Sequence, residues 1–286
     1  MIEYGFFRFV IALVSILPWK IVEFFAFGTS VLFLIFPYRK STIDANLIRC
    51  FPQFSQQEVS QIRKKYYRFL SRLFWETLKG YSVSHQQAKS RFFFKNPEVV
   101  QQFLNANKSV IGLAAHYGNW ELGALSSGLF FHRVIGLYKP IKNQRINRFV
   151  RKKRGQFGLQ LGAIEHTHRI FAKNQNPAHL FLLVADQQPS NREKAIWVDF
   201  FGQETPCLHG AEMYGQRFNM PVVFIDIIPK SFGKYEAHFI PISEDASSLQ
   251  PGELTQTFMS QVENRIRIHP EHWLWSHRRW KWNKNK

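Results

Sequence analysis

His116 and Glu121 are the pair of side chains in this sequence best suited to acid–base chemistry. They stand in the stretch His-Tyr-Gly-Asn-Trp-Glu, directly after the apolar run of residues 110–115. Histidine is the side chain whose ordinary pKa lies nearest neutral pH, and a carboxylate that fixes its tautomer makes it a better general base. The spacing therefore predicts a His-x4-Glu motif in which Glu121 orients His116.

The same two residues also fit a structural role. A histidine at the end of a strand often only satisfies local hydrogen bonds, and a glutamate in a first helical turn complements the helix dipole. Acid–base pairs with perturbed pKa values occur in purely structural networks as well. The pair alone leaves both interpretations open.

A strand, a turn and a helix are expected to position the pair. Residues 109–115 have the composition of a buried strand, the chain turns at Gly118, and Asn119 is a suitable N-cap for a helix over residues 119–131. In α/β proteins such strand ends carry functional groups. We therefore expect the imidazole at a strand end and the carboxylate in the first turn of the following helix.

Strands and helices alternate from Asn96-Pro97 onward. This alternation predicts a single α/β domain with a mixed, largely parallel sheet flanked by helices. Before it, Ser55 and Glu58 form a capping box that predicts a helix of about twenty residues. The expected strands are residues 109–115, 133–139, 179–185, 222–229 and 235–242. The expected helices are residues 97–106, 119–131, 143–157, 167–174, 208–218 and 254–269.

The N-terminal stretch is the second informative region. Two apolar runs, residues 6–17 and 21–36, are separated by Pro18, and neither reaches the ~18 uninterrupted apolar residues of a membrane span. Because no small-residue cleavage site follows, we expect a retained anchor, either a short helical hairpin in one leaflet or one marginal span. A buried helix pair in a soluble core is the alternative. We assign residues 1–40 to this membrane-associating helical segment and residues 41–286 to the α/β domain.

The composition points to lipid and to anionic partners. The chain carries a formal charge of +18 and contains 29 Phe and 8 Trp, which suits contact with an anionic surface that is also apolar. Trp19-Lys20 and the stretch from Tyr38 to Lys40 resemble the aromatic and basic flanks found at membrane interfaces. Cys50 and Cys207 form no disulfide framework or metal spacing, so we expect a reducing compartment.

Three further stretches follow expected strands. They are residues 137–143, which lead into the basic helix 145–154, then Asp186 with Gln187, and the aromatic turn of residues 198–206. Taken singly they read as a solvated face, a helix cap and a packing turn. Ligands of α/β folds bind beyond the carboxyl ends of strands, so we expect all three around one site.

With these stretches in place, the chain resembles the bacterial lipid A late acyltransferase family (lauroyl and myristoyl acyltransferases), within the lysophospholipid-acyltransferase-like superfamily. Lys139 stands where many members have arginine, and residues 206–210 differ from the Thr/Gly-rich version of the lauroyl enzymes, which leaves the acceptor and the acyl length open. The motifs that carry the resemblance run almost end to end: Asn46-Leu47, Cys50-Phe51-Pro52, Glu76, the stretch from His116 to Glu121, Tyr138-Lys139-Pro140 with Asn143, Asp186-Gln187, Phe200-Phe201-Gly202 with Thr205, and the stretch from Trp273 to Lys281.

The resemblance implies an acyltransferase-type domain at the cytoplasmic face of a bacterial inner membrane. Its reaction would move a fatty acyl chain from a thioester of acyl carrier protein or coenzyme A to a hydroxyl of a lipid A precursor or related glycolipid. His116 would be the general base and Glu121 would orient it, with direct attack, no acyl-enzyme and no metal or cofactor. The expected substrate contacts are Tyr117, Asn119, Lys139, Asn143, Arg145, Arg154, Asp186, Gln187, Gly202 and Thr205.

Other functions stay open at this point. A lysophospholipid or an aminolipid is an alternative acceptor. A non-catalytic basic protein of the membrane surface is a different class, against which the intact pair of His116 and Glu121 argues. Nucleic-acid binding fits the charge, but no module of that kind is present, so no nucleic acid is expected. The expected partners are the acyl donor, a glycolipid or phospholipid acceptor and an anionic membrane surface.

Overall fold

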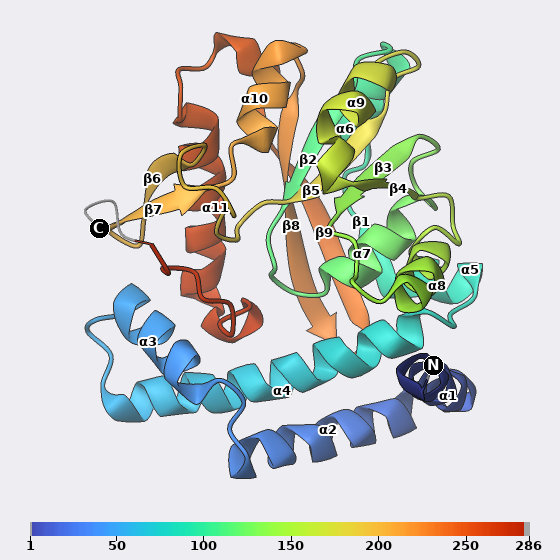
Figure 1. The fold of residues 1–286 in the computed structure, drawn as a ribbon, viewed down its shortest axis with the longest axis vertical. Helices are drawn as coiled ribbons and strands as arrows, with labels where there is room; N and C mark the ends of the chain where they lie inside the picture. Colours follow the sequence, from blue (N-terminus) through green and yellow to red (C-terminus); the bar gives the residue numbers. More distant parts are fainter. Residues whose placement is uncertain (1, 283–286) are drawn as a thin grey trace.

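A seven-stranded sheet forms the centre of the computed structural model, which describes residues 2–282 (Figure 1). The strand order is β1-β9-β8-β2-β5-β3-β4, and every neighbouring pair is parallel except the antiparallel hairpin β8–β9. The predicted mixed, largely parallel sheet is therefore confirmed. Its strands are β1 (Phe92–Phe94), β2 (Val110–Ala114), β3 (Val134–Tyr138), β4 (Gln160–Ala163), β5 (Leu180–Val184), β8 (Val222–Ser231) and β9 (Lys234–Ser243).

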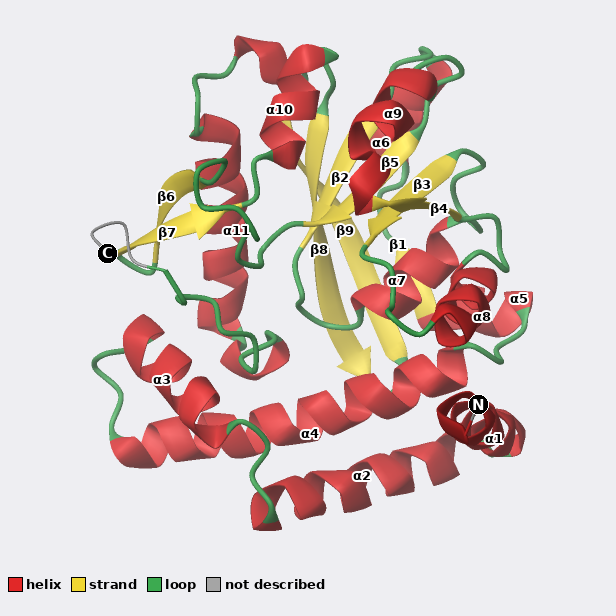
Figure 2. Cartoon of the chain, in the orientation of Figure 1, coloured by secondary structure: helices red, strands yellow, loops and turns green. Residues whose placement is uncertain are grey.

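Helices cover both faces of this sheet (Figure 2). Along β2, Val110 and Ala114 belong to one buried cluster whereas Ile111 and Leu113 belong to another, because successive side chains of a strand point to opposite faces. Burial on both faces explains why this strand is a continuous apolar run. The helices after the first strand are α6 (Glu98–Asn105), α7 (Trp120–Ser127), α8 (Gln144–Arg154), α9 (Thr167–Lys173), α10 (Gly210–Arg217) and α11 (Glu253–Ile268), and short 3-10 turns cover Ile164–His166, Ala246–Ser248 and Pro270–His272.

All five strands and all six core helices expected from the sequence are present, although most of the helices are shorter than expected. Sequence reasoning missed four strands. β1 is only three residues long and β4 only four, which is too short for an alternating pattern to be visible. β6 (Ile196–Phe200) and β7 (Gln203–Cys207) form a separate two-stranded hairpin in the segment that was interpreted as an aromatic turn.

The N-terminal part of the chain is a layer of helices along one end of the sheet (Figure 1). Ser55 and Glu58 make the predicted capping box, and the helix that they start is 25 residues long. This helix, α4, packs against α2. The helices of the layer are α1 (Ile2–Ile16), α2 (Trp19–Ile35), α3 (Lys40–Cys50), α4 (Gln56–Gly80) and α5 (His85–Arg91).

The outer side of α1 and α2 is apolar. On α2 only Val22, Ala26 and Ser30 are buried, at the four-residue spacing of a single helix face. In the described chain, no single helix has the length and hydropathy of a membrane span. Only α2 and α3 taken together have that length and hydropathy, and the axes of these two helices are bent by 88° at the break between them. The large exposed apolar side chains of the two helices are Phe6, Phe9, Leu13, Ile16, Ile21, Phe24, Phe25, Phe27, Val31, Leu32, Leu34 and Ile35.

These helices confirm the expected helical N-terminus. Neither of them is by itself the single marginal membrane span that the sequence analysis considered as one form of the anchor. Both helices also pack on α4. Lys79 of α4 donates to the backbone oxygens of Val14 at 3.2 Å and Ser15 at 2.7 Å, both in α1. The contact of this segment with a membrane, and the division of the chain at residue 40, stay predictions.

Candidate active site

His116 and Asp186 meet at the carboxyl edge of the sheet. β2 and β5 are parallel neighbours with Ala114 opposite Val184, so the residues two positions beyond each strand end lie side by side. The Nδ1 atom of His116 is 2.7 Å from Oδ1 of Asp186. The other oxygen, Oδ2, accepts a hydrogen bond from Nε1 of Trp273 at 2.7 Å. Both oxygens of this buried carboxylate are therefore held by partners.

The surroundings of Asp186 favour its ionised form. Burial by itself would raise the pKa of this carboxyl, but the neighbouring His116 and the hydrogen bonds from His116 and Trp273 outweigh burial and lower it. An ionised carboxylate only accepts hydrogen bonds, so the proton between the two residues belongs to Nδ1 of His116. The lone pair of the neutral imidazole is then on Nε2, and the ring lines an open cleft.

The turn that carries His116 is fixed by the C-terminal segment of the chain. The backbone oxygen of His116 accepts from the nitrogen of Leu274 at 3.0 Å, and the nitrogen of Gly118 donates to the oxygen of His272 at 3.0 Å. Gly118 has φ of +62°, and a Cβ there would lie 2.8 Å from Cγ2 of Ile227, so the position requires glycine. The N–H of Gly118 is therefore already used within the protein.

Glu121 has a different partner from the one predicted. Its two oxygens accept from Arg154, with Nε to Oε2 at 2.8 Å and Nη2 to Oε1 at 2.5 Å. Burial alone would lower the pKa of Arg154, but the carboxylate outweighs burial and raises it. Asp186, and not Glu121, lies on Nδ1 of His116. The parallel register of β2 and β5 identifies Asp186 as the partner of His116. The spacing of residues along a helix, on which the prediction of Glu121 was based, does not indicate this contact.

A cleft of about 390 Å³ opens over these groups. His116, Glu121, Arg154, Lys139 and Gln187 line it, so five of the residues predicted from the sequence come together, with Asp186 behind His116. Gln188 and Ser190 line it as well, although sequence reasoning missed them. The apolar side chains of the wall are Trp120, Ala124, Leu137, Leu159, Leu161, Ile164, Leu182, Val184 and Leu208.

A second, apolar cavity lies between α7 and the sheet. It shares Trp120, Ala124, Leu182 and Val184 with the cleft, and its space is about 40 Å³. Its further lining comes from α7 and from strands β1, β2, β5 and β8, and no charged side chain takes part: Phe92, Phe94, Ala114, Gly123, Leu183, Ile225 and Ile227. The two spaces therefore adjoin, and one of them is almost entirely apolar.

Asn119 and Tyr117 make hydrogen bonds that support the structure around the site. Asn119 caps α7, since its Oδ1 accepts from the nitrogen of Leu122 at 2.9 Å, and its Nδ2 donates to Oε2 of Glu76 at 3.0 Å. Glu76 is fully buried and also accepts from the hydroxyl of Tyr235 at 2.5 Å. The hydroxyl of Tyr117 donates to the backbone oxygen of His269 at 3.3 Å. Neither Asn119 nor Tyr117 lines the cleft.

Asn143 and Arg145 also lie outside the cleft lining. Asn143 caps α8, with its Oδ1 accepting from the nitrogens of Arg145 and Ile146 at 3.1 and 3.3 Å. Its Nδ2 donates to Oε2 of Glu3 at 3.3 Å, and this contact ties α8 to α1. The side chain of Arg145 is exposed. Direct substrate contacts of both residues stay predictions.

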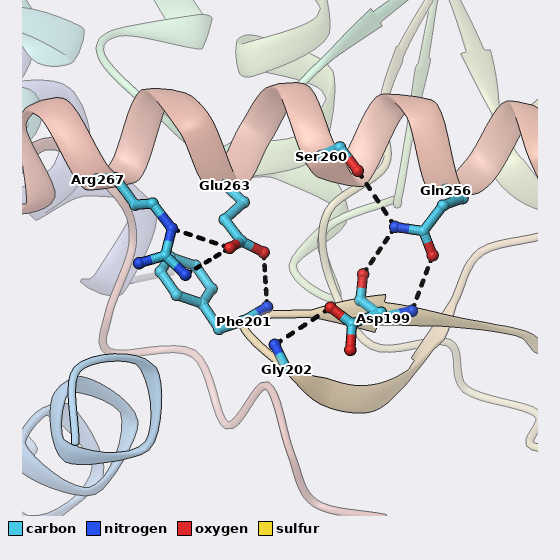
Figure 3. A network of polar contacts seen from close by, with 7 residues as sticks. All are labelled: Asp199, Phe201, Gly202, Gln256, Ser260, Glu263 and Arg267. Carbon is cyan, nitrogen blue, oxygen red and sulfur yellow. Dashed lines mark hydrogen bonds and ion pairs between the residues drawn. The ribbon is translucent and has the colours of Figure 1, made fainter.

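Gly202 belongs to the tip of the β6–β7 hairpin, which Figure 3 shows against α11. Phe201 and Gly202 have φ of +57° and +68°, the pair of positive values that a two-residue hairpin turn needs. The nitrogen of Gly202 donates to Oδ1 of Asp199 at 3.1 Å, and that of Phe201 to Oε2 of Glu263 at 2.6 Å. Arg267 holds the other oxygen of Glu263. This conspicuous motif therefore anchors a hairpin to a helix.

Thr205 is buried in the same hairpin. Its Oγ1 donates to the backbone oxygen of Gln203 at 2.8 Å and accepts from Nε1 of Trp280 at 2.9 Å. Phe200 stacks on the ring of Trp280, with centroids 5.9 Å apart. Gly202 and Thr205 thus lie outside the cleft lining, and their contacts join the hairpin to the C-terminal segment that holds the turn of His116. Within residues 2–282, no three His, Cys, Asp or Glu side chains gather as a metal site requires.

Comparison of the amino-acid sequence with known proteins identifies a family for this chain. The sequence profile of the family described as "Bacterial lipid A biosynthesis acyltransferase" matches residues 2–282. The "Lipid A biosynthesis acyltransferase" of Haemophilus influenzae is 22% identical over 249 residues, which cover 83% of this chain and 74% of that protein. The "Lipid A biosynthesis palmitoleoyltransferase" of Escherichia coli is 22% identical over 274 residues, covering 93% and 86%. Since the family profile spans nearly all of the chain, this protein belongs to the bacterial lipid A biosynthesis acyltransferases.

Proposed function

We propose that this protein transfers a fatty acyl chain from an acyl thioester to a hydroxyl of a lipid A precursor or a related glycolipid, with His116 as general base. The observation that carries the proposal is the pairing of Nδ1 of His116 with the buried carboxylate of Asp186, at 2.7 Å, beneath an open cleft with an apolar wall. Such a pair is built to remove a proton, and such a wall suits an acyl chain.

In the proposed transfer, Nε2 of His116 accepts the proton, because Nδ1 already carries one. The acceptor hydroxyl gives its proton to Nε2 of His116 while its oxygen attacks the thioester carbonyl carbon. The tetrahedral intermediate then collapses, the carbon–sulfur bond breaks, and the departing sulfur takes the proton from Nε2. Asp186 stays ionised throughout and stabilises the imidazolium, so it takes the orienting part that the sequence assigned to Glu121.

The charge that develops on the carbonyl oxygen needs donors in the cleft. Glu121 occupies Nε and Nη2 of Arg154, which leaves Nη1 outside the pair. We assign Arg154 to the stabilisation of this oxyanion, since a fixed cation in a partly buried site requires little reorganisation. The exposed Lys139, which also lines the cleft, is the second cation of this proposal. In this scheme Glu121 acts on the reaction through Arg154.

Direct attack agrees with the placement of the two cysteines. Cys50 and Cys207 are both buried, neither lines the cleft, and burial raises the pKa of each thiol. A thiol with a raised pKa is a poor nucleophile because only the thiolate attacks. An acyl-enzyme on cysteine is therefore disfavoured, and the acceptor oxygen is the nucleophile of the proposal.

The cleft and the adjoining cavity both offer apolar surface to an acyl chain. We propose that the chain runs from the cleft into the cavity that Phe92 and Phe94 line. The donor is a thioester of acyl carrier protein or coenzyme A, and the exposed apolar side of α1 and α2 rests on the cytoplasmic face of the inner membrane. The charge of +18 favours that anionic surface. A lysophospholipid or an aminolipid is the alternative acceptor.

Mass spectrometry of total lipids from cells with and without the active protein tests this function. Loss of one acyl chain from lipid A, restored by the wild-type protein but not by His116→Ala, is the expected result. Loss of an acyl chain from a phospholipid or aminolipid instead would move the proposal to the alternative acceptor. An unchanged lipid profile, with no transfer from acyl thioesters to a lipid extract in vitro, would reject acyl transfer by this protein.

A further inference from the structure

A basic pocket lies beside the catalytic cleft, between the end of the N-terminal helices and the C-terminal segment. Arg39, Arg278 and Lys281 line it, and no acidic side chain is among its lining residues. Its open space is about 580 Å³. All three cationic side chains are exposed, and none of them takes part in an ion pair found within residues 2–282. Three like charges around one hollow favour an anion there.

The position of Arg39 is fixed by the backbone. It precedes α3 in a left-handed conformation, with φ of +49°, which is uncommon for a residue with a side chain. Its Nη1 donates to the backbone oxygen of Ser276 at 3.0 Å. This contact joins the start of α3 to the C-terminal segment that also carries Arg278 and Lys281. The cations of the pocket thus come from two distant parts of the sequence that are held together.

The pocket and the catalytic cleft share one wall. Gln188 and Ser190 line both of them. The nitrogen of Gln188 donates to Nε2 of His277 at 3.3 Å, and its Oε1 accepts from the nitrogen of Lys281 at 3.0 Å. Burial lowers the pKa of His277 to about 4, so this ring is a neutral acceptor and the positive charge of the pocket comes from the other side chains. Gln188 stands two residues beyond Asp186, which holds His116.

The pocket also adjoins the apolar side of α2. Ile35 and Phe36, at the end of that helix, are exposed at 61% and 74%, and Arg39 follows three residues after Phe36. A molecule with an apolar tail on α2 and an anionic group in the pocket would place its intervening hydroxyls near the shared wall. An arginine fork binds the oxygens of phosphate in pairs, which makes phosphate the anion that suits this lining best.

We propose that the pocket of Arg39, Arg278 and Lys281 binds a phosphate group carried by one of the two substrates and thereby sets the position of that substrate relative to His116. The inference rests on the proposed acyl transfer and adds a binding site to it. The phosphate belongs either to the headgroup of the acceptor lipid or to the carrier part of the acyl donor. Both sources present the same group to the same three cations.

The test compares two variants of equal charge. One carries Arg39→Gln, Arg278→Gln and Lys281→Gln; the control carries Lys64→Gln, Lys89→Gln and Lys173→Gln, three exposed lysines that line neither space. Steady-state kinetics are measured with a lipid A precursor and with the same lipid after phosphatase treatment. We expect the pocket variant to raise the KM for the phosphorylated acceptor roughly tenfold with little change in kcat, and the treated lipid to be insensitive to the variant.

A donor arm identifies the source of the phosphate. An increase in the KM for acyl-coenzyme A, with no change for an acyl-pantetheine that lacks phosphate, would place the group on the donor and still support the site. Equal effects of the two triple variants, or no change in the KM of any phosphorylated substrate, would overturn it. Circular dichroism verifies the fold of each protein.

A binding arm keeps this result separate from the proposed function. Calorimetric titration of the lipid A precursor in detergent micelles into His116→Ala protein, with and without the pocket substitutions, needs no turnover. Tighter binding of the phosphorylated than of the treated lipid, lost with the pocket substitutions, supports the site even if no transfer is ever observed. Equal affinities for the two lipids, with donor kinetics unaffected, reject the site even if the enzyme is active.

Discussion

Asp186 holds Nδ1 of His116 at 2.7 Å, and each residue stands two positions beyond the end of its own strand in the adjacent parallel pair β2 and β5. The distance between them in the sequence is 70 residues, but the register of two strands fixes their separation. This relationship makes Asp186 the positioning residue of the proposed base.

The first prediction follows from that contact. Asp186→Asn keeps the size of the side chain but removes its charge and can present an N–H to Nδ1 of His116, which favours the wrong tautomer. We expect kcat for acyl transfer to fall by about 10²- to 10⁴-fold, with the fold preserved. Transfer of a radiolabelled acyl group to lipid extract measures the loss, and circular dichroism checks the fold. Trp273→Phe, which leaves the His116 contact in place, should lose far less; a fully active Asp186→Asn protein would assign the orienting role elsewhere.

The second prediction concerns stability and pH. The pKa of Asp186 is lower in the folded protein than its usual value of 3.8, so the unfolded chain binds a proton at this site more readily. The stabilisation is complete above the usual value and is lost as the pH falls through the lowered folded value. In urea unfolding, the difference in free energy between wild type and Asp186→Asn should be present at about pH 5 and shrink below about pH 4. A difference that does not shrink below about pH 4 would contradict the lowered pKa.

The third prediction addresses Glu121 and Arg154. Glu121→Ala removes the partner of a partly buried guanidinium, and Arg154→Ala removes the proposed oxyanion donor, so each should lower kcat by about 10²- to 10³-fold. Because Glu121 acts through Arg154, the double variant should be little worse than Arg154→Ala alone. Glu121→Asp should retain part of the activity. If the two losses multiply in the double variant, Glu121 has a function that does not depend on Arg154.

Five strands of the central sheet, β2, β3, β5, β8 and β9, were predictable because each has at least five residues, long enough for an apolar run or an alternation to be visible. β1 and β4 were not, since three or four residues carry no usable periodicity. The site, too, was predictable only in part. His116 and Asp186 were both visible as polar residues after strands, but their mutual contact depends on strand order, which local sequence does not encode. The turn of Phe201 and Gly202 was identified correctly as a motif, whereas its attachment to Glu263 of α11 arises only from tertiary packing.

The fourth prediction concerns the length of the acyl chain. Phe92 and Gly123 both line the cavity under α7, and a Cβ on Gly123 would lie 2.8 Å from Cζ of the Phe92 ring. Phe92→Leu should lengthen the preferred acyl chain, and Gly123→Ala should shorten it. Phe93→Leu is the matched control, because its side chain is 48% exposed on the same strand. Competition between acyl thioesters of different length, read by mass spectrometry, gives the preference. If neither cavity variant shifts it, the acyl chain lies elsewhere in the cleft.

The last prediction tests the apolar side of the N-terminal helices. Phe24, Phe27 and Ile35 of α2 are exposed at 68%, 60% and 61%, so replacing them costs little in folding but removes apolar area from a membrane contact. We expect the combined change of all three to Asp to release the protein from anionic phospholipid vesicles in a flotation assay. The matched control changes Phe93, Met213 and Ile268, which are exposed apolar residues of other elements, to Asp.

The control triple should stay on the vesicles, because it adds the same negative charge at sites away from α1 and α2. High salt separates the two contributions further: it should weaken the electrostatic part of binding for every protein and leave the apolar part of the wild type intact. Release of both triple variants alike would show that charge alone holds the protein on the membrane. Retention of the α2 variant on the vesicles would exclude this helix face as the contact surface.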